Sequence, residues 1–374
     1  MYDAIVVGAR CAGAPTAMLL AREGFRVLLL DRDTFPSDIM STHYIHPPGV
    51  AALSQWGVLD AVLASGCPPL RRTSFALGPQ VTVSEHDPEG RAIALCPRRH
   101  VLDKILVDAA VKAGVELRED FVVRDLLFAP DGAVTGITAR DAAGRTVSEE
   151  ARIVVGADGL HSRVARLVQP TEYNRVETLL CAYYSYFSGV EVERDCIYLY
   201  GTLGAGVLAF PTNRSLLCIA AARPRAQMAA FRANMEAAFF ESIELANAEF
   251  AARVRAGRRE ERFLGTGDLP HYFRKPYGPG WALVGDAGLH LDPTNGLGIT
   301  KAFSEVQLLA PALAAGLRGQ RPMDEALAEY HARRDQQWVP LGQQNLEMSS
   351  AVGLAAPGRF RPWSEIEAEI AAAP

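Results

Sequence analysis

The sequence predicts an α/β protein in which a Rossmann-like dinucleotide-binding domain is interleaved with an α+β part built on an antiparallel sheet. Two observations support this fold class. Apolar, strand-like runs end in glycines at three widely separated places, and helical runs follow them, as in a parallel sheet that binds a ligand. Short strand-like runs with turn residues between them dominate residues 171–280, as in an antiparallel sheet.

The N-terminal stretch has the layout of a dinucleotide-binding unit. An apolar run over residues 2–7 precedes Gly8 and Gly13, a helical run follows, and a second apolar run over residues 26–30 ends in Asp31. Gly8 permits a tight turn, Gly13 permits close packing of the helix on the sheet, and Asp31 can accept hydrogen bonds from a ribose. The N–H groups at the start of the helix would meet a pyrophosphate. We expect no signal or transit peptide before this unit.

Arg10 stands where the dinucleotide fingerprint normally has its second glycine, the residue that keeps the backbone close to the pyrophosphate. Two outcomes are open. Either the Arg10 side chain swings outward and adds positive charge near the phosphates, or the loop binds no nucleotide.

Composition limits the class of protein. The 374 residues are 49% apolar and 22% charged, as expected for a globular enzyme, and a net charge of −5 without a basic block argues against nucleic acid as a partner. The six cysteines have no metal-binding spacing, so we expect reduced thiols, no metal site and a cytoplasmic protein. No apolar run reaches the roughly 20 residues of a membrane span. The oligomeric state is left open.

The chain crosses between its two parts more than once. The helical and parallel-strand patterns assign residues 1–66, 98–170 and 281–345 to the nucleotide-binding domain. The antiparallel pattern, with strands expected at 73–77, 81–83 and 93–95, assigns residues 67–97 and 171–280 to a substrate domain. The helical pattern continues from residue 324 to 338. We expect residues 346–374 to form a less regular tail with a short helix near 364–371.

Two histidines lie in a loop near residue 45. His43 and His46 precede Pro47 and Pro48, which we expect to interrupt regular structure before a helix resumes at Val50. A histidine changes charge near neutral pH wherever it lies, so the pair could be simple solvent-facing residues or could serve chemistry.

Aromatic residues crowd the strands expected between residues 179 and 221. Packing of a sheet on helices explains most of them. Because alternate residues of a strand face opposite sides, one face could still line a substrate pocket. The candidates for such a pocket are Tyr184, Tyr186, Tyr198 and Phe210.

Two further strands end in glycines. The run 152–155 leads into Gly156-Ala157-Asp158-Gly159 and a helix, and the run 281–284 leads into Gly285-Asp286. The loop after Asp286 contains Pro293, Gly296 and Gly298, and a helix begins near Ile299. The N-terminus of this helix would favour negative charge in front of the loop.

These three glycine-bearing motifs, in this order and spacing, resemble the group A flavoprotein monooxygenases of the para-hydroxybenzoate hydroxylase type. The resemblance covers residues 1 to about 315 and implies FAD as cofactor. It places Asp31 and Arg32 at the adenosine, Arg99 and Asp286 at the ribityl and phosphate portion, and residues 296–298 at the pyrimidine edge of the flavin. The full implied set is Gly8, Arg10, Gly13, Asp31, Arg32, Arg99, Asp158, Gly285, Asp286, Pro293, Gly296, Leu297 and Gly298. In this family, the loop after the second strand often carries an arginine near the flavin. This chain departs from that pattern, because it has no arginine between Arg32 and Arg71.

The resemblance also implies a reaction. NADH or NADPH reduces FAD, oxygen adds to give a flavin hydroperoxide, and one oxygen atom hydroxylates or epoxidises a small aromatic or polyketide-like substrate, as in secondary metabolism. His43, His46 and His290 are the candidates for moving a proton, since histidine titrates in the useful range.

Other members of the same fold give alternatives. Geranylgeranyl-reductase-like flavoproteins reduce double bonds, and their strand ending in Phe-Pro is partly echoed at Phe210-Pro211. Flavin halogenases need a lysine in the first part of the second domain, but in this chain no lysine precedes Lys104. A non-catalytic flavin-binding protein is the third alternative.

Overall fold

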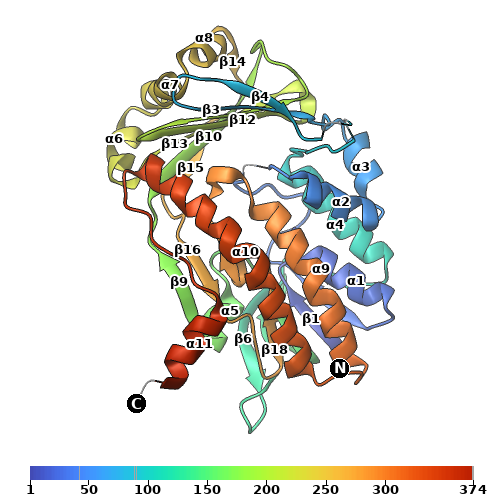
Figure 1. Cartoon of the computed structure of the whole chain (residues 1–374). Helices are drawn as coiled ribbons and strands as arrows, with labels where there is room; N and C mark the ends of the chain where they lie inside the picture. The colour runs from blue at the N-terminus through green and yellow to red at the C-terminus, as the bar shows by residue number, and fades with distance from the viewer. Residues whose placement is uncertain (42, 88, 90, 373–374) are drawn as a thin grey trace.

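The computed structural model describes residues 1–41, 43–87, 89 and 91–372, and two large sheets organise it (Figure 1). The first sheet has a parallel core in which β1 lies between β2 and β8, as the N-terminal pattern predicts. Its continuous path contains β17 (Tyr277–Gly278), β18 (Trp281–Leu283), β8 (Thr146–Gly156), β1 (Tyr2–Val7), β2 (Val27–Leu30) and β5 (Glu116–Arg118). The long strand β8 also pairs with β7 (Val134–Arg140), which pairs with β6 (Val122–Phe128).

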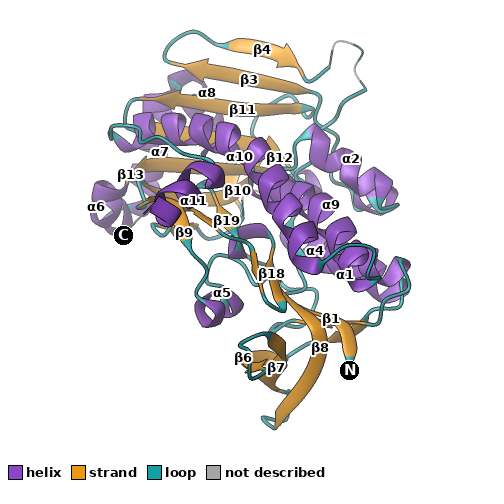
Figure 2. Cartoon of the chain, turned by 60° about the horizontal axis from the view of Figure 1, so that its bottom comes forward, coloured by secondary structure: helices purple, strands orange, loops and turns teal. Residues whose placement is uncertain are grey.

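Both faces of the parallel core are covered, which is why strands β1 and β2 are almost continuously apolar. One face packs on α1 (Gly13–Arg22), α4 (Arg99–Lys112) and α9 (Gly298–Leu317), and the other packs on β6, β7 and α5 (Arg163–Val168). Helices α2 (Pro47–Gln55) and α3 (Leu59–Ala64) extend the first of these layers. Figure 2 shows the β6–β7 hairpin at the far end of β8 from the second sheet.

The second sheet carries α6 (Met228–Ala233), α7 (Met235–Ala246) and α8 (Ala248–Ala256) on its outer face (Figure 1). Its strands in order are β14 (Arg258–Arg259), β10 (Leu180–Ser188), β13 (Leu217–Pro224), β12 (Ala205–Pro211), β11 (Cys196–Thr202), β3 (Arg72–Leu77) and β4 (Thr82–Glu85), and β15 (Leu264–Thr266) also pairs with β10. The sheet is mixed, because β3 joins β11 in parallel after a long crossover. The strand expected at 93–95 forms only isolated bridges.

A small third sheet connects the two parts. It consists of β19 (Leu289–His290), β16 (His271–Arg274) and β9 (Glu172–Val176). Its apolar residues pack on α10 (Met323–Gly353) and on the segment that carries α11 (Trp363–Ala372). Helices α9 and α10 lie side by side across the molecule (Figure 1).

Two helix boundaries differ from the sequence expectation. Helix α2 begins at Pro47, because prolines fit the first helical turn, where their missing N–H groups have no partner to lose. Helix α10 continues through Pro340 to Gly353, so the tail expected to be irregular from residue 346 begins as helix. Buried Trp338, Leu346 and Val352 hold this helix against the rest of the protein despite the proline.

All six cysteines are buried free thiols. Within the described ranges, no helix has both the length and the apolar content needed to cross a bilayer. The same residues contain no group of three or more metal-binding side chains that could hold an ion.

Phe239 tests the packing of the second sheet on its helices. The side chain is fully buried, and its ring lies 4.8 Å from that of Phe263 and 5.9 Å from that of Phe187, measured between centroids. Phe239→Ala should lower the free energy of unfolding by about 3–5 kcal/mol in urea titrations followed by circular dichroism. Leu203→Ala, at a side chain 76% exposed, should change it by less than about 0.5 kcal/mol. Equal values for the two variants would contradict this packing.

Candidate functional site

The first glycine-rich turn is compact enough to exclude side chains. Gly8 has a φ of +100°, and a Cβ atom there would lie 2.5 Å from the carbonyl oxygen of Ala157. A Cβ atom on Gly13 would lie 1.7 Å from the carbonyl oxygen of Gly8. Only glycine fits both positions, and the second motif thus lies directly against the first.

Asp31 closes this turn from the end of β2. Its buried carboxylate accepts hydrogen bonds from the N–H groups of Ala9 (2.7 Å) and Asp33 (3.0 Å), and burial raises its pKa despite these bonds. Arg32 is exposed. A carboxylate at the C-terminal end of the second strand, beside the start of α1, is the arrangement that holds a ribose in dinucleotide-binding folds.

Asp103 connects the first turn to helix α4. Its fully buried carboxylate accepts hydrogen bonds from Arg10 Nη1 (2.9 Å), Arg99 Nε (3.1 Å) and the Cys11 thiol (3.3 Å). Arg10 also donates to Asp33 through Nη2, at 2.7 Å. The Arg10 side chain therefore bridges two carboxylates beside the turn. Arg99 is held at the beginning of α4, where the Asp103 carboxylate, with a smaller contribution from Asp286, outweighs burial and raises the pKa of its guanidinium.

Asp158 caps helix α5. Its Oδ2 accepts from the N–H groups of Arg163 (2.6 Å) and Val164 (3.2 Å), and its Oδ1 accepts from the Ser162 hydroxyl (2.5 Å). The backbone of Asp158 lies beside the glycine-rich turn that contains Gly8. Its neighbour Gly159 faces open space, because a Cβ atom on Gly159 would meet nothing within 4 Å.

The third motif contacts the first through glycine. Gly285 has a φ of +66°, and a Cβ atom there would lie 2.9 Å from the Cβ of Ala12. Its N–H donates to Glu305 Oε2 at 2.7 Å. Lys301, fully buried, donates from Nζ to the Leu289 carbonyl (2.6 Å) and lies 3.3 Å from both Asp286 Oδ1 and Glu305 Oε1. Helix α9 thus fixes the loop that carries Asp286.

A second buried network holds the loop before α9. Asp292 accepts from His271 Nε2 (2.9 Å) and Asn345 Nδ2 (3.0 Å), and the N–H of Asn295 donates to Asn345 Oδ1 (3.2 Å). These bonds tie Pro293, which begins a short 3₁₀ turn, to the C-terminal half of α10.

The N-terminus of α9 faces open space. Gly298 is exposed, and a Cβ atom there would meet nothing within 4 Å. Leu297 precedes the helix, and Gly296, with a φ of +62°, packs against the ring of Tyr44. The first N–H groups of a helix have no intrahelical partner, so this end offers donors to an anion.

His43 lies on the aromatic face of the second sheet. Its ring is fully buried, stacks on Tyr186, and meets Tyr184 and Phe210 edge-on. Nε2 lies 2.5 Å from the Tyr186 hydroxyl, whereas Nδ1 has no hydrogen-bond partner among the described residues. Burial, with the nearby charge of Arg99, lowers the pKa of His43 to about 3, so the imidazole is neutral.

The structure brings together three of the four aromatic pocket candidates. Tyr184, Tyr186 and Phe210 share one buried cluster with Tyr44, whose ring packs against Gly296. Tyr198 does not join them, because β11 turns it to the opposite face, where its ring stacks on Phe250 of α8 at 5.2 Å.

The other two candidate histidines occupy different surroundings. The His46 ring donates from Nε2 to the Asn295 carbonyl (2.9 Å), and the backbone N–H of His46 donates to Thr300 Oγ1 (2.9 Å). These two bonds hold the start of α2 against α9. His290 donates from Nδ1 to the Pro270 carbonyl and stacks on Tyr272. Burial lowers the pKa of both histidines. The His46 ring also packs on Tyr44 of the aromatic cluster, at 4.1 Å between centroids.

These residues fit FAD. The helix N-terminus at Gly13, the Asp31 carboxylate, the Arg99 cation and the open N-terminus of α9 supply the donors and acceptors that a dinucleotide needs. Sequence reasoning missed the residues that support them: Lys301, Glu305, His271 and Asn345. The sequence signal for two of them was the spacing of Lys301 and Glu305, four residues apart in an otherwise apolar helical segment.

Gly298 tests the open space in front of α9. Gly298→Ala should leave the unfolding free energy unchanged or raise it by up to about 1 kcal/mol, because alanine favours a helix. It should weaken FAD binding at least about tenfold in fluorescence titrations if the flavin lies against this helix end. Ser304→Ala, on the same helix, is the control and should bind FAD as the wild type does. Unchanged FAD affinity in Gly298→Ala would contradict this placement.

His43 makes stability depend on pH. The unfolded chain takes up a proton on this histidine below about pH 6.5, whereas the folded protein does not until about pH 3, so stability falls as the pH drops through this window. Between pH 7 and pH 5, the wild type should lose about 2 kcal/mol more than His43→Gln in urea titrations. Equal losses in the two proteins would show that the folded protein protonates His43 as readily as the unfolded chain.

Comparisons with known proteins agree with this geometry. Residues 1–214 match the family described as FAD binding domain. Digeranylgeranylglycerophospholipid reductase 1 of Methanococcoides burtonii is 26% identical over 341 residues, 89% of this chain and 79% of that protein. Rifampicin monooxygenase of Streptomyces venezuelae is 31% identical over 187 residues, 48% of this chain and 37% of that protein.

Solved structures share the fold over nearly the whole chain. The myxobacterial chondrochloren halogenase CndH has a TM-score of 0.86 at 22% identity, covering 99% of this chain and 89% of its own. PqsL of P. aeruginosa, in complex with 2-aminobenzoylacetate, has a TM-score of 0.79 at 20% identity, covering 94% and 98%. At these identities the likeness shows the fold alone. With more than half of its length matched by the FAD binding domain, the chain belongs to that family of flavoproteins, of the group A monooxygenase type.

Proposed function

We propose that the protein is an FAD-dependent monooxygenase that uses NADH or NADPH and O₂ to hydroxylate or epoxidise a small aromatic or polyketide-like molecule. The observation that carries the proposal is the buried aromatic cluster of Tyr44, Tyr184, Tyr186 and Phe210. It lies between the second sheet and the loop before α9, and Tyr44 packs directly on Gly296. An apolar, aromatic lining beside the flavin end of the site suits a planar substrate.

Bound FAD would supply the transfer of electrons from the reductant to oxygen. The chain's own contribution is to position and to protect. The N-terminus of α9 would stabilise negative charge on the pyrimidine edge of the flavin. Lys301, which lies 3.3 Å from Asp286 Oδ1, would keep that carboxylate in place for the ribityl portion. The aromatic cluster excludes water from the reacting atoms.

His43 is the residue placed to accept a hydrogen bond from a substrate hydroxyl, because its buried ring is neutral, with a pKa of about 3. With Nε2 engaged by the Tyr186 hydroxyl, either tautomer of the neutral ring leaves Nδ1 available to a substrate atom. A buried polar atom without a partner is uncommon in a folded protein, and a substrate hydroxyl would satisfy it. His46 and His290 each donate one ring N–H to a backbone carbonyl, and neither has a buried nitrogen without a partner, so His43 is the stronger candidate of the three.

A reductase is the second candidate. The specific observation in its favour is the 26% identity to a digeranylgeranylglycerophospholipid reductase over 89% of this chain. Reduction adds two hydrogens to a double bond, whereas monooxygenation adds one oxygen atom, so product mass separates the two reactions. A flavin-binding protein without catalysis would show no bleaching of its flavin by NADH or NADPH under anaerobic conditions.

Tyr186 and His43 test the proposal. With ¹⁸O₂, the product should gain one labelled oxygen atom by mass spectrometry. Tyr186→Phe and His43→Gln should each lower oxygenated product per NAD(P)H consumed by at least about tenfold while FAD content stays the same. Tyr200→Phe, on the helix-facing side of the sheet, is the matched control and should retain wild-type product yield. A product that gains hydrogen and no labelled oxygen would refute monooxygenation.

A further inference from the structure

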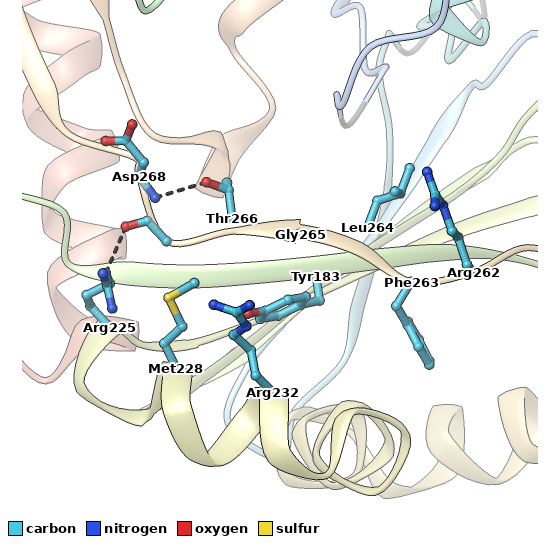
Figure 3. Close-up of a pocket in the computed structure, with 11 residues that line it drawn as sticks. Tyr183, Arg225, Met228, Arg232, Arg262, Phe263, Leu264, Gly265, Thr266 and Asp268 are labelled. Atoms are coloured by element: carbon cyan, nitrogen blue, oxygen red, sulfur yellow. Dashed lines mark hydrogen bonds between the residues drawn. The ribbon is translucent and has the colours of Figure 1, made fainter.

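A groove on the outer side of the second sheet lies apart from the FAD site. Its volume is about 620 Å³, and Figure 3 shows residues of α6, β10 and β15 around it. Tyr183, Arg225, Met228 and Arg232 lie on the same side of β15, whereas Arg262 and Leu264 point to the other side (Figure 3).

Tyr183 contributes a buried hydroxyl without a partner. The side chain is only 5% exposed, its ring stacks on Phe231 at 4.6 Å, and its hydroxyl makes no hydrogen bond among the described residues. Gly265 packs on the ring so closely that a Cβ atom there would lie 2.0 Å from Tyr183 Cδ1. The ring is thus fixed, with its hydroxyl end beside the Arg232 side chain (Figure 3). Buried hydroxyls are normally satisfied, so this one points to a missing acceptor.

Two guanidinium groups lie near this hydroxyl. Burial raises the pKa of the Tyr183 hydroxyl, and the positive charges of Arg232 and Arg225 only partly offset this. Arg225 donates from Nε to the Gly267 carbonyl at 2.8 Å, and neither arginine has a carboxylate partner in the described part of the chain. Asp268, at the rim, donates its N–H to Thr266 Oγ1 and has its carboxylate 3.5 Å from His161 Nε2. The groove therefore presents two arginines without a carboxylate partner and a hydroxyl donor, with one carboxylate, that of Asp268, at its rim.

The groove cannot be the substrate pocket. Tyr183 and Tyr184 are neighbours on β10, so their side chains point to opposite faces of the sheet. Tyr184 belongs to the aromatic cluster beside the FAD site, whereas Tyr183 belongs to the core that faces α6–α8. A ligand in the groove would have the full thickness of the sheet between itself and the flavin.

We propose that this groove is a second binding site, for a phosphate monoester group. Arg232 and Arg225 would pair with two of its oxygens, and the Tyr183 hydroxyl would donate to a third once the exposed Arg232 side chain moves aside. A phosphate monoester carries nearly two negative charges at neutral pH, which matches the two unpaired arginines. The phosphate could be free or part of an organic molecule such as a nucleotide.

Calorimetric titration of the FAD-loaded protein tests the site, because bound FAD already fills the pyrophosphate position. At fixed ionic strength, inorganic phosphate, 2′-AMP and 5′-AMP are titrated separately. Saturable binding of at least one of them is expected, with at least about tenfold weaker affinity in Arg232→Gln. Equal affinity for all three ligands would identify free phosphate as sufficient, and tighter binding of a nucleotide would identify an organic phosphate.

Two further variants make the test specific. Tyr183→Phe removes a hydroxyl with no protein partner, so it should keep or raise the melting temperature without phosphate and reduce the rise that phosphate causes. Arg333→Gln, at an exposed arginine of α10, should bind phosphate as the wild type does. No saturable binding of any of the three ligands to the wild type, or wild-type affinity in Arg232→Gln, would overturn the proposal.

Discussion

The cofactor site depends on the burial of the Asp103 carboxylate and the need to satisfy it. Leaving a buried carboxylate without donors costs several kcal/mol. Three groups avoid this cost by donating hydrogen bonds to Asp103: the side chains of Arg10 and Arg99 and the Cys11 thiol. This fixes the first glycine-rich turn to α4 and sets the position of Arg99. Glu305 does the same for the third motif, because it binds the N–H of Gly285 and the ammonium of Lys301. Two buried carboxylates thus hold the two turns at which we propose that FAD binds.

Much of the fold could be predicted because its signals are local. Strand β1, the last part of β8 and strand β18 are apolar runs that lead into glycines, and β2 is an apolar run that ends before Asp31. The glycines are required by backbone contacts such as that of Gly13 with Gly8. Features set by tertiary contacts could not be predicted. Helix α10 continues past Pro340 because buried Trp338 and Leu346 hold it in place, and the parallel pairing of β3 with β11 depends on chain crossing rather than on local pattern.

The site was predictable to a similar extent. Alternation along β10 places Tyr184 and Tyr186 on one face, but nothing in the sequence says which face β11 turns toward the flavin, and Tyr198 lies on the other one. The supporting network of His271, Asp292 and Asn345 joins residues far apart in the chain, so no spacing could reveal it. Arg10 bridges Asp33 and Asp103, an arrangement that depends on α4. The roles of the individual residues toward FAD stay predictions.

The central claim is that three separate glycine-bearing strand ends surround one FAD molecule. Their mutual contacts, Gly8 with Ala157 and Gly285 with Ala12, already bring the three motifs together. A crystal structure of the FAD complex is the most direct measurement. We expect the adenosine beside Asp31, the pyrophosphate at the start of α1 near Arg99, and the flavin ring against Gly298. FAD bound elsewhere, or with its ring away from the N-terminus of α9, would contradict it.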